Sequence, residues 1–279
     1  MMIQIWGLTS RNTGDRLMLR AIVEHFAGSG HRLCADYKIA PYAERAQLGL
    51  YQRVRTDKYP LLEGVASRLL TSRTRENYGL VLQHEVDAVL DASGFAYSDQ
   101  WRSGRGRRTA ALYGHWKHQG KKIVLLPQAL GPLKVSENRL YFLGIADAAD
   151  LVFARDKMSY DHADSLDFDK TKLRQAPDFT NLLEPLPAER DPRRVCIIPN
   201  LRMIDKTDRR TGACYPDLMK KCALVVKDLG LRPVVLVHEE NDVDFAELIA
   251  SALPFEIEVA KDLAPLETKA YIGASRFAV

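Results

Sequence analysis

Residues 122–132 read KIVLLPQALGP, an apolar run of strand length that ends in a loop with two prolines and a glycine. Such a run is typical of a buried strand in a parallel sheet, because helices cover both faces of that strand. The same order of apolar strand, polar loop and amphipathic helix is found at 3–26, 86–119 and 151–165. This alternation predicts an α/β protein with parallel sheets flanked by helices.

A domain boundary is predicted near residue 187. Residues 184–192 are dense in proline and charge, which disfavours continuing helix or sheet and is typical of a linker. The strand and helix pattern restarts after it. We therefore expect two Rossmann-like domains, at 1–187 and 188–279. About 90 residues follow the linker, fewer than a doubly wound domain usually has, so we expect the C-terminal domain to be incomplete.

Two further segments carry structural predictions. Residues 43–85, rich in arginine and leucine, are expected to be helical. Residues 276–279 are expected to begin a strand.

Composition excludes several classes of protein. With 46% hydrophobic and 27% charged residues the chain is globular, not disordered. The net charge of +4 suits an acidic small substrate, and no recognisable nucleic-acid module is present. The N-terminus lacks a signal peptide and no apolar run reaches the ~20 residues of a membrane span, so we expect a cytoplasmic protein. The four cysteines are scattered without a CxxC pair, which predicts free thiols and no metal site.

Four unusual loops follow predicted strands, and in an open α/β sheet ligands bind beyond the carboxyl ends of the strands. The loops are Asn12-Thr13-Gly14-Asp15, Ser93-Gly94 with Asp99, Gln128 to Pro132, and Arg155-Asp156. Each has a purely structural alternative, such as a helix cap, a turn glycine or a surface ion pair. Because all four fall at one edge of the sheet, we expect them to converge on an anion-binding cleft.

The same segments resemble the motifs of the polysaccharide pyruvyl transferase family. The similarity is carried by Asn12-x-Gly14-Asp15 (N-x-G-D), Asp91-Ala92-Ser93-Gly94 (a glycine-rich loop), Gln128 to Pro132 (Q-G-x-G-P), Val152 to Ser159 (V-x-x-R-D-x-x-S) and Ala176-Pro177-Asp178 (A-P-D). It extends from residue 3 to about 273. Two departures stand out: the glycine-rich loop retains only Gly94, and the family's R-x-H motif is expected beyond Val279.

The resemblance implies a GT-B-like pair of Rossmann domains. It implies transfer of pyruvate from phosphoenolpyruvate to a pair of sugar hydroxyls, as a ketal, in surface or exopolysaccharide biosynthesis. Phosphoenolpyruvate is then the donor substrate, and no cofactor is expected. The acceptor is expected to be a sugar or a lipid-linked oligosaccharide, through which the protein would contact the membrane surface.

Candidate site residues follow from the motifs and the chemistry. Arg155 is the candidate for gripping the donor anion, since a guanidinium binds carboxylate or phosphate in bidentate fashion, and His115 is the candidate proton donor. Asp15 is expected to cap a helix more than to catalyse. The candidate substrate-binding residues are Asn12, Gly14, Asp15, Ser93, Gly94, Gln128, Gly131, Asp178 and Arg105.

The tract Arg102, Arg105, Arg107 and Arg108 has two interpretations. It is either a solvated, mobile loop or a flap that recruits an anionic donor or a lipid-pyrophosphate-linked sugar.

Two alternative functions remain open from the sequence. One is a GT-B glycosyltransferase that uses a nucleotide sugar, and the other is a non-catalytic binding member of the same family. A nicotinamide-dependent dehydrogenase is disfavoured, because the loop from Gly7 to Gly14 lacks G-x-G-x-x-G.

Overall fold

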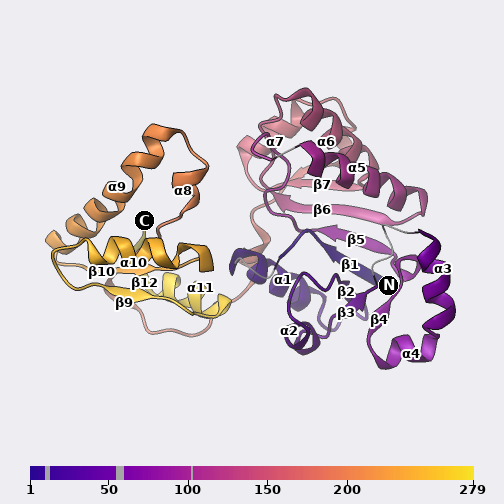
Figure 1. Cartoon of the computed structure of the whole chain (residues 1–279), viewed down its shortest axis with the longest axis horizontal. Coiled ribbons are helices and arrows are strands. Elements are labelled where there is room, and N and C mark those ends of the chain that lie inside the picture. The colour runs from indigo at the N-terminus through magenta and orange to yellow at the C-terminus, as the bar shows by residue number, and fades with distance from the viewer. Residues whose placement is uncertain (10–12, 55–59, 102) are drawn as a thin grey trace. The chain divides into compact units, whose positions relative to one another are not determined.

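A computed structural model describes residues 1–9, 13–54, 60–101 and 103–279 of the chain. The chain divides into two compact units. The larger holds most of the first 183 residues, and the smaller holds residues 184–279 together with residues 13–17. Each unit contains a parallel sheet flanked by helices (Figure 1), which confirms the predicted α/β class.

The larger unit is built on an eight-stranded, all-parallel sheet of order β4-β3-β2-β1-β5-β6-β7-β8. Its strands are β1 (Met2–Trp6), β2 (Arg32–Ala35), β3 (Tyr51–Arg53), β4 (Leu80–Val81), β5 (Ala88–Asp91), β6 (Lys122–Gln128), β7 (Leu151–Ala154) and β8 (Leu173–Gln175). The chain adds strands outward from β1 to β4, then returns to the other side of β1 with β5. The order therefore reverses between β1 and β5, where the register pairs Trp6 with Asp91.

Helices connect these strands and cover the sheet. They are α1 (Thr13–Phe26), α2 (Tyr42–Gln47), α3 (Pro60–Leu69), α4 (Ser72–Asn77), α5 (Ser103–His118), α6 (Ser136–Ala148), α7 (Lys157–Asp164) and the short 3-10 turns η1 (Gln83–Glu85), η2 (Lys170–Lys172) and η3 (Phe179–Leu182). Helices α5 and α6 lie side by side (Figure 1) and bury Trp116 and Phe142 against β5, β6 and β7. The ring of Trp116 packs edge to face against that of Trp6 in β1, with 5.2 Å between the ring centroids, so this core extends to the centre of the sheet.

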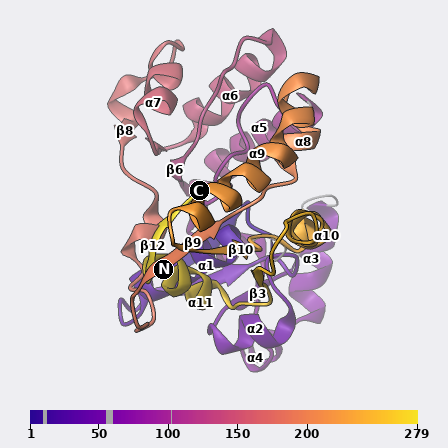
Figure 2. The same cartoon turned by 90° about the vertical axis from the view of Figure 1, so that its left-hand side faces the viewer.

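The smaller unit has a four-stranded parallel sheet of order β11-β10-β9-β12. Its elements are β9 (Asp191–Ile197), α8 (Arg202–Asp205), α9 (Arg209–Asp228), β10 (Arg232–Leu236), η4 (Glu240–Asp242), α10 (Val243–Ser251), β11 (Glu258–Ala260), α11 (Pro265–Gly273) and β12 (Ser275–Ala278). Figure 2 shows α9 and α11 on opposite sides of this sheet. Two separate apolar clusters explain this arrangement, one around Ile197 and Tyr215 and the other around Cys196 and Val234.

Most of the predicted strands and helices are present, including the strand at the end of the chain, which is β12. The helical prediction for residues 43–85 is wrong in part, because this stretch also contains β3 and β4. These two strands have three and two residues, too few to produce a strand period. Strands β2 and β8, also short, were not predicted.

The predicted linker at 184–192 overlaps the start of β9. Pro192 is accommodated in this central strand because the pairing with β12 is irregular there, with register partners at Asp191 and Val195 and a shift between them.

Candidate functional site

A cleft of about 920 Å³ opens at the carboxyl ends of β1 and β5, where the strand order of the larger unit reverses. This is the position at which open α/β sheets bind ligands, because the loops on the two sides diverge there. Four segments and the side chain of Gln83 line the cleft. The segments are residues 5–9 from β1 and its loop, 36–39 after β2, 93–97 after β5, and one face of α5 from Arg105 to Gln119.

The α5 wall of the cleft is cationic. Arg105 and Arg108 are exposed and one helical turn apart, and His115 lies two turns further along. Lys38, in the loop that follows β2, adds a fourth basic side chain to the lining of the cleft. The side-chain nitrogen of Gln119 lies 3.0 Å from Nε2 of His115, within hydrogen-bond distance.

The acidic residue that lines this cleft is already engaged. Asp36, 8% exposed, lies 3.6 Å from the fully buried guanidinium of Arg53. Arg53 also donates to the side-chain oxygen of Gln83 at 2.7 Å, and Gln83 lines the cleft as well. This pairing offsets the charge of Asp36, so the cleft as a whole favours an anion.

Gly7 and Ser93 form the floor of the cleft where β1 and β5 end. Gly7 has φ of +93°, and a Cβ placed on it would lie 2.0 Å from Ser93 Oγ and 2.9 Å from Asp91 Oδ1. Residue 7 is therefore restricted to glycine by its backbone angle and also by the direct packing of two strand-end loops.

The carboxyl group of Asp91 fixes the position of Ser93 through hydrogen bonds. Its carboxylate is fully buried, and Oδ1 accepts hydrogen bonds from the amide and the hydroxyl of Ser93 at 2.9 and 2.5 Å. Oδ2 accepts from the hydroxyls of Tyr97, at 2.5 Å, and Tyr113. Burial and the neighbouring charge of Asp91 raise the pKa of both tyrosines well above its usual value, so both remain protonated donors.

The loops after β5 and β6 are joined by backbone hydrogen bonds. The amide of Ala129 donates to the carbonyl of Gly94, that of Gly131 to Tyr97, and that of Asp99 to Pro132. Asp99 in turn accepts from the amides of Lys134 and Val135 and from the side chain of Asn138, which fixes the start of α6. The predicted convergence of these two loops is thus built from main-chain contacts.

The segment from Arg155 to Ser159, which follows β7, holds the loop that follows β6 through hydrogen bonds. Asp156 caps α7 by accepting from the amide of Ser159 at 2.7 Å, and this bond is the largest cause of a lowered pKa at Asp156. Ser159 Oγ accepts from the amide of Leu130, and His162 Nδ1 donates to the Leu130 carbonyl at 3.0 Å. His162 also packs against Gly131, where a Cβ would lie 2.6 Å from Nδ1.

Arg155 forms an ion pair with Asp178 at 3.4 Å, and both side chains are about one third exposed. Asp178 also accepts from the amide and hydroxyl of Thr180, so it caps the start of η3. The two residues lie beyond β7 and β8 and are not among those lining the 920 Å³ cleft. Their predicted roles in binding a ligand stay predictions.

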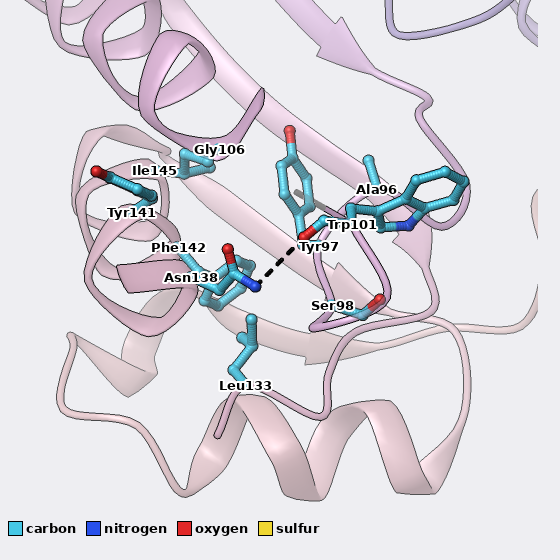
Figure 3. A pocket seen from close by; sticks show the side chains of 10 residues that line it. All are labelled: Ala96, Tyr97, Ser98, Trp101, Gly106, Leu133, Asn138, Tyr141, Phe142 and Ile145. Carbon is cyan, nitrogen blue, oxygen red and sulfur yellow. Dashed lines mark hydrogen bonds between the residues drawn. The ribbon is translucent and has the colours of Figure 1, made fainter. Parts of the chain in front are cut away.

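A second, much smaller cavity of about 20 Å³ lies behind the loop of residues 96–101 (Figure 3). The Asn138 side chain donates to the carbonyl of Trp101 across it at 3.5 Å. Gly106 of α5 borders this cavity, and a Cβ there would lie 3.2 Å from the Tyr141 side chain of α6. The cavity has room for a water molecule at most, so we regard it as a packing feature between α5 and α6.

The basic tract is not a loop. From residue 103 onward it forms the first two turns of α5, although Gly104 and Gly106 disfavour a helix. Gly106 lies where α5 approaches α6, so a larger residue there would displace the Tyr141 side chain slightly. Arg102 lies outside the described residues.

The structure thus brings Ser93, Arg105 and His115 together in one cleft. Gly94 is buried with φ of +67°, and Gln128 is fully buried with its amide group donating to the carbonyl of Asp91 at 3.1 Å. Gly14 and Asp15 lie in the first turn of α1, and Asn12 falls outside the described residues.

Sequence reasoning missed several residues of the cleft. Lys38 and Asp36 follow a strand that was not predicted, and Gly7 carries no signal beyond being a glycine after a strand. Asp91 had a clearer signal, because it is a carboxylate at the end of an apolar strand, next to Ser93 and Gly94.

Neither a metal-binding cluster nor a membrane-crossing helix is found in the described part of the chain. No three His, Cys, Asp or Glu side chains there are arranged to hold a metal ion. No helix in the same residues combines the length and apolar character that crossing a bilayer requires.

Two parallel sheets flanked by helices, with a cleft where the strand order of the larger unit reverses, define an α/β protein of the GT-B-like class. Its backbone is similar to Anabaena Alr3699/HepE in complex with UDP and glucose (TM-score 0.57, 11% identity, 99% of this chain and 73% of that chain). It is also similar to MnaA of S. aureus in a co-structure with UDP (TM-score 0.58, 12% identity, 99% and 72%). At these identities the likeness concerns the fold.

A third similar fold is the UDP-GlcNAc 2-epimerase of Methanocaldococcus jannaschii (TM-score 0.51, 8% identity, 100% of this chain and 78% of that chain). No curated protein sequence matches this chain. The model of the polysaccharide pyruvyl transferase family matches residues 12–279, nearly the whole chain, and the chain belongs to that family.

Proposed function

We propose that this protein transfers the pyruvyl group of phosphoenolpyruvate to two hydroxyls of a sugar, forming a cyclic ketal and releasing phosphate. The observation that carries the proposal is the cationic wall of the cleft, formed by Arg105, Arg108 and Lys38 around the end of β1 and β5. Phosphoenolpyruvate carries a phosphate and a carboxylate, and guanidinium groups bind both through charge-assisted hydrogen bonds. Membership of a transferase family supports the same reaction class.

The reaction sets clear demands on the site. One sugar hydroxyl adds to the central carbon of the donor while the methylene carbon takes up a proton and becomes a methyl group. The second hydroxyl then replaces phosphate at the same carbon, which closes the ketal. His115 is the proposed acid for the first step, because it lines the cleft beside the cations that would hold the donor.

Arg155 is the proposed second anion contact. Its pairing with Asp178 is partly exposed, so the guanidinium is accessible and the carboxylate holds it in orientation. We further propose that the acceptor belongs to surface or exopolysaccharide biosynthesis and that the reaction is cytoplasmic. A lipid-linked oligosaccharide acceptor would bring the protein to the membrane surface.

The test is to incubate the full chain with phosphoenolpyruvate and a panel of glycans, measuring phosphate release and the mass of the glycan. We expect Arg108→Ala to raise KM for the donor roughly 10- to 100-fold, the effect of one charge-assisted hydrogen bond. We expect His115→Ala to lower kcat by about 10²–10⁴. Arg139→Ala, an exposed arginine on α6 away from the cleft, is the matched control.

Two outcomes would reject this function. One is the absence of phosphate release with every glycan, combined with sugar transfer from a nucleotide sugar in a parallel reaction. The other is wild-type kinetics in both cleft variants.

A further inference from the structure

Ser93 has its only hydroxyl proton committed inside the protein. Its Oγ lies 2.5 Å from Asp91 Oδ1, and the backbone amide of the same residue donates to the same oxygen. Both contacts run from Ser93 to Asp91, so the Ser93 hydroxyl is the donor and the carboxyl oxygen the acceptor. What remains free on Ser93 Oγ is its lone pairs, and Ser93 lines the cleft.

The carboxyl group of Asp91 is fully engaged inside the protein. Its two oxygens together accept four hydrogen bonds, which fill the usual acceptor positions of a carboxylate. The group is fully buried, so neither water nor a substrate hydroxyl reaches it directly. Asp91 is therefore a positioning residue that acts through Ser93.

The neighbouring loop prevents Ser93 from turning away. A Cβ on Gly7 would lie 2.0 Å from Ser93 Oγ, which means that the hydroxyl occupies the space beside the Gly7 backbone. The Gln128 side chain donates to the carbonyl of Asp91 and fixes the end of β5 from the side of β6. Three strand ends thus hold one hydroxyl oxygen in one orientation.

We propose that Ser93 is a hydroxyl-recognition site: its oxygen accepts a hydrogen bond from a sugar hydroxyl of the acceptor and disfavours phosphate or carboxylate oxygens. Anionic oxygens lack a proton to donate and would meet the lone pairs of Ser93. The cleft thus has two subsites: the cations of α5 bind an anion, and Ser93 binds a hydroxyl. The assignment to the acceptor rests on the proposed function, whereas the preference for a hydroxyl donor rests on the hydrogen bonds of Ser93 alone.

The experiment measures binding, so that it is separate from turnover. Methyl glycosides of glucose, galactose and mannose, and phosphoenolpyruvate, are titrated into wild type, Ser93→Ala and Ser98→Ala by calorimetry. Ser98 lies in the same loop, is 3% exposed, and borders the small cavity instead of the cleft. We expect Ser93→Ala to weaken the glycoside that binds best about three- to tenfold, the range of one neutral hydrogen bond, and to leave phosphoenolpyruvate affinity within about twofold. Ser98→Ala should change neither affinity.

The role of Asp91 is tested by a double-mutant cycle. Asp91→Asn should weaken glycoside binding in the wild-type background and have no further effect in the Ser93→Ala background, because it acts through the serine. Tyr113→Phe, which keeps three of the four hydrogen bonds to Asp91, is the second variant if Asp91→Asn fails to fold.

The outcomes separate this inference from the proposed function. Three results overturn the inference about Ser93, whatever the turnover result. They are unchanged glycoside affinity in Ser93→Ala, weaker phosphoenolpyruvate binding in that variant, and no glycoside binding to wild type. Loss of glycoside affinity in a protein that releases no phosphate from phosphoenolpyruvate supports the hydroxyl site and rejects the reaction.

Discussion

Gly7→Ala is expected to destabilise the larger unit strongly, because the new methyl group has no room. The backbone angle of +93° costs an alanine about 1–2 kcal/mol. The Cβ would also lie 2.0 Å from Ser93 Oγ, which would break the charge-assisted hydrogen bond to Asp91 at a cost of roughly 1.5–3 kcal/mol. The Ser93 Cα and Asp91 Oδ1, both at 2.9 Å, force a backbone shift worth about 1–3 kcal/mol. Together these contributions predict a loss of about 3.5–8 kcal/mol of unfolding free energy.

Gly28→Ala is the matched control. Gly28 has φ of +75°, but nothing lies within 4 Å of a Cβ there, so this variant carries the backbone cost alone, about 1–2 kcal/mol. Urea unfolding followed by tryptophan fluorescence reports the larger unit, since Trp6, Trp101 and Trp116 all lie in it. Equal destabilisation by the two variants would refute the packing argument. The double variant Gly7→Ala/Ser93→Gly should recover part of the unfolding free energy that Gly7→Ala loses.

Three other predictions concern buried and titrating groups. Arg53→Met removes a fully buried guanidinium that bonds Gln83 and pairs with Asp36, and should lower the unfolding free energy by about 3–5 kcal/mol in the same urea assay. The hydrogen bond from the Ser159 amide lowers the pKa of Asp156 in the folded state, so its stabilising contribution is present above the unfolded-state pKa and is lost as the pH falls through the folded-state pKa. Asp156→Asn should remove this part of the acid dependence of the melting temperature. Burial raises the pKa of the Cys34 thiol to about 12, so a thiol reagent at pH 8 should label exposed Cys214 in the native protein and Cys34 only after unfolding; native labelling of Cys34 would contradict this.

The loops of the site could be predicted because each follows an apolar strand. Ser93, and Arg155 with Asp156, were identified by that position and by resemblance, without knowledge of their contacts. What the sequence did not reveal is that Asp156 and Ser159 secure the loop containing Leu130, which makes much of that motif structural. A motif records which residues occur together, whereas the hydrogen bonds decide which of them are left to bind a ligand.

The basic tract illustrates the limit of local reasoning. Two glycines within a run of arginines predict a loop, since each glycine costs a helix about 1 kcal/mol relative to alanine. In the structure the same residues begin α5, and Gly106 lies where this helix packs closely against Tyr141 of α6. As a result Arg105 and Arg108 face the cleft from a rigid helix.

The sequence by itself determined the alternation of strands and helices and the loops at the strand ends, because these depend on local periodicity and on proline and glycine. Tertiary structure decided which loops meet. The order β2-β1-β5 places Lys38, Gly7 and Ser93 around one cleft, although they are up to 86 residues apart in the chain. Strand order arises from long-range pairing and packing, which no local pattern encodes.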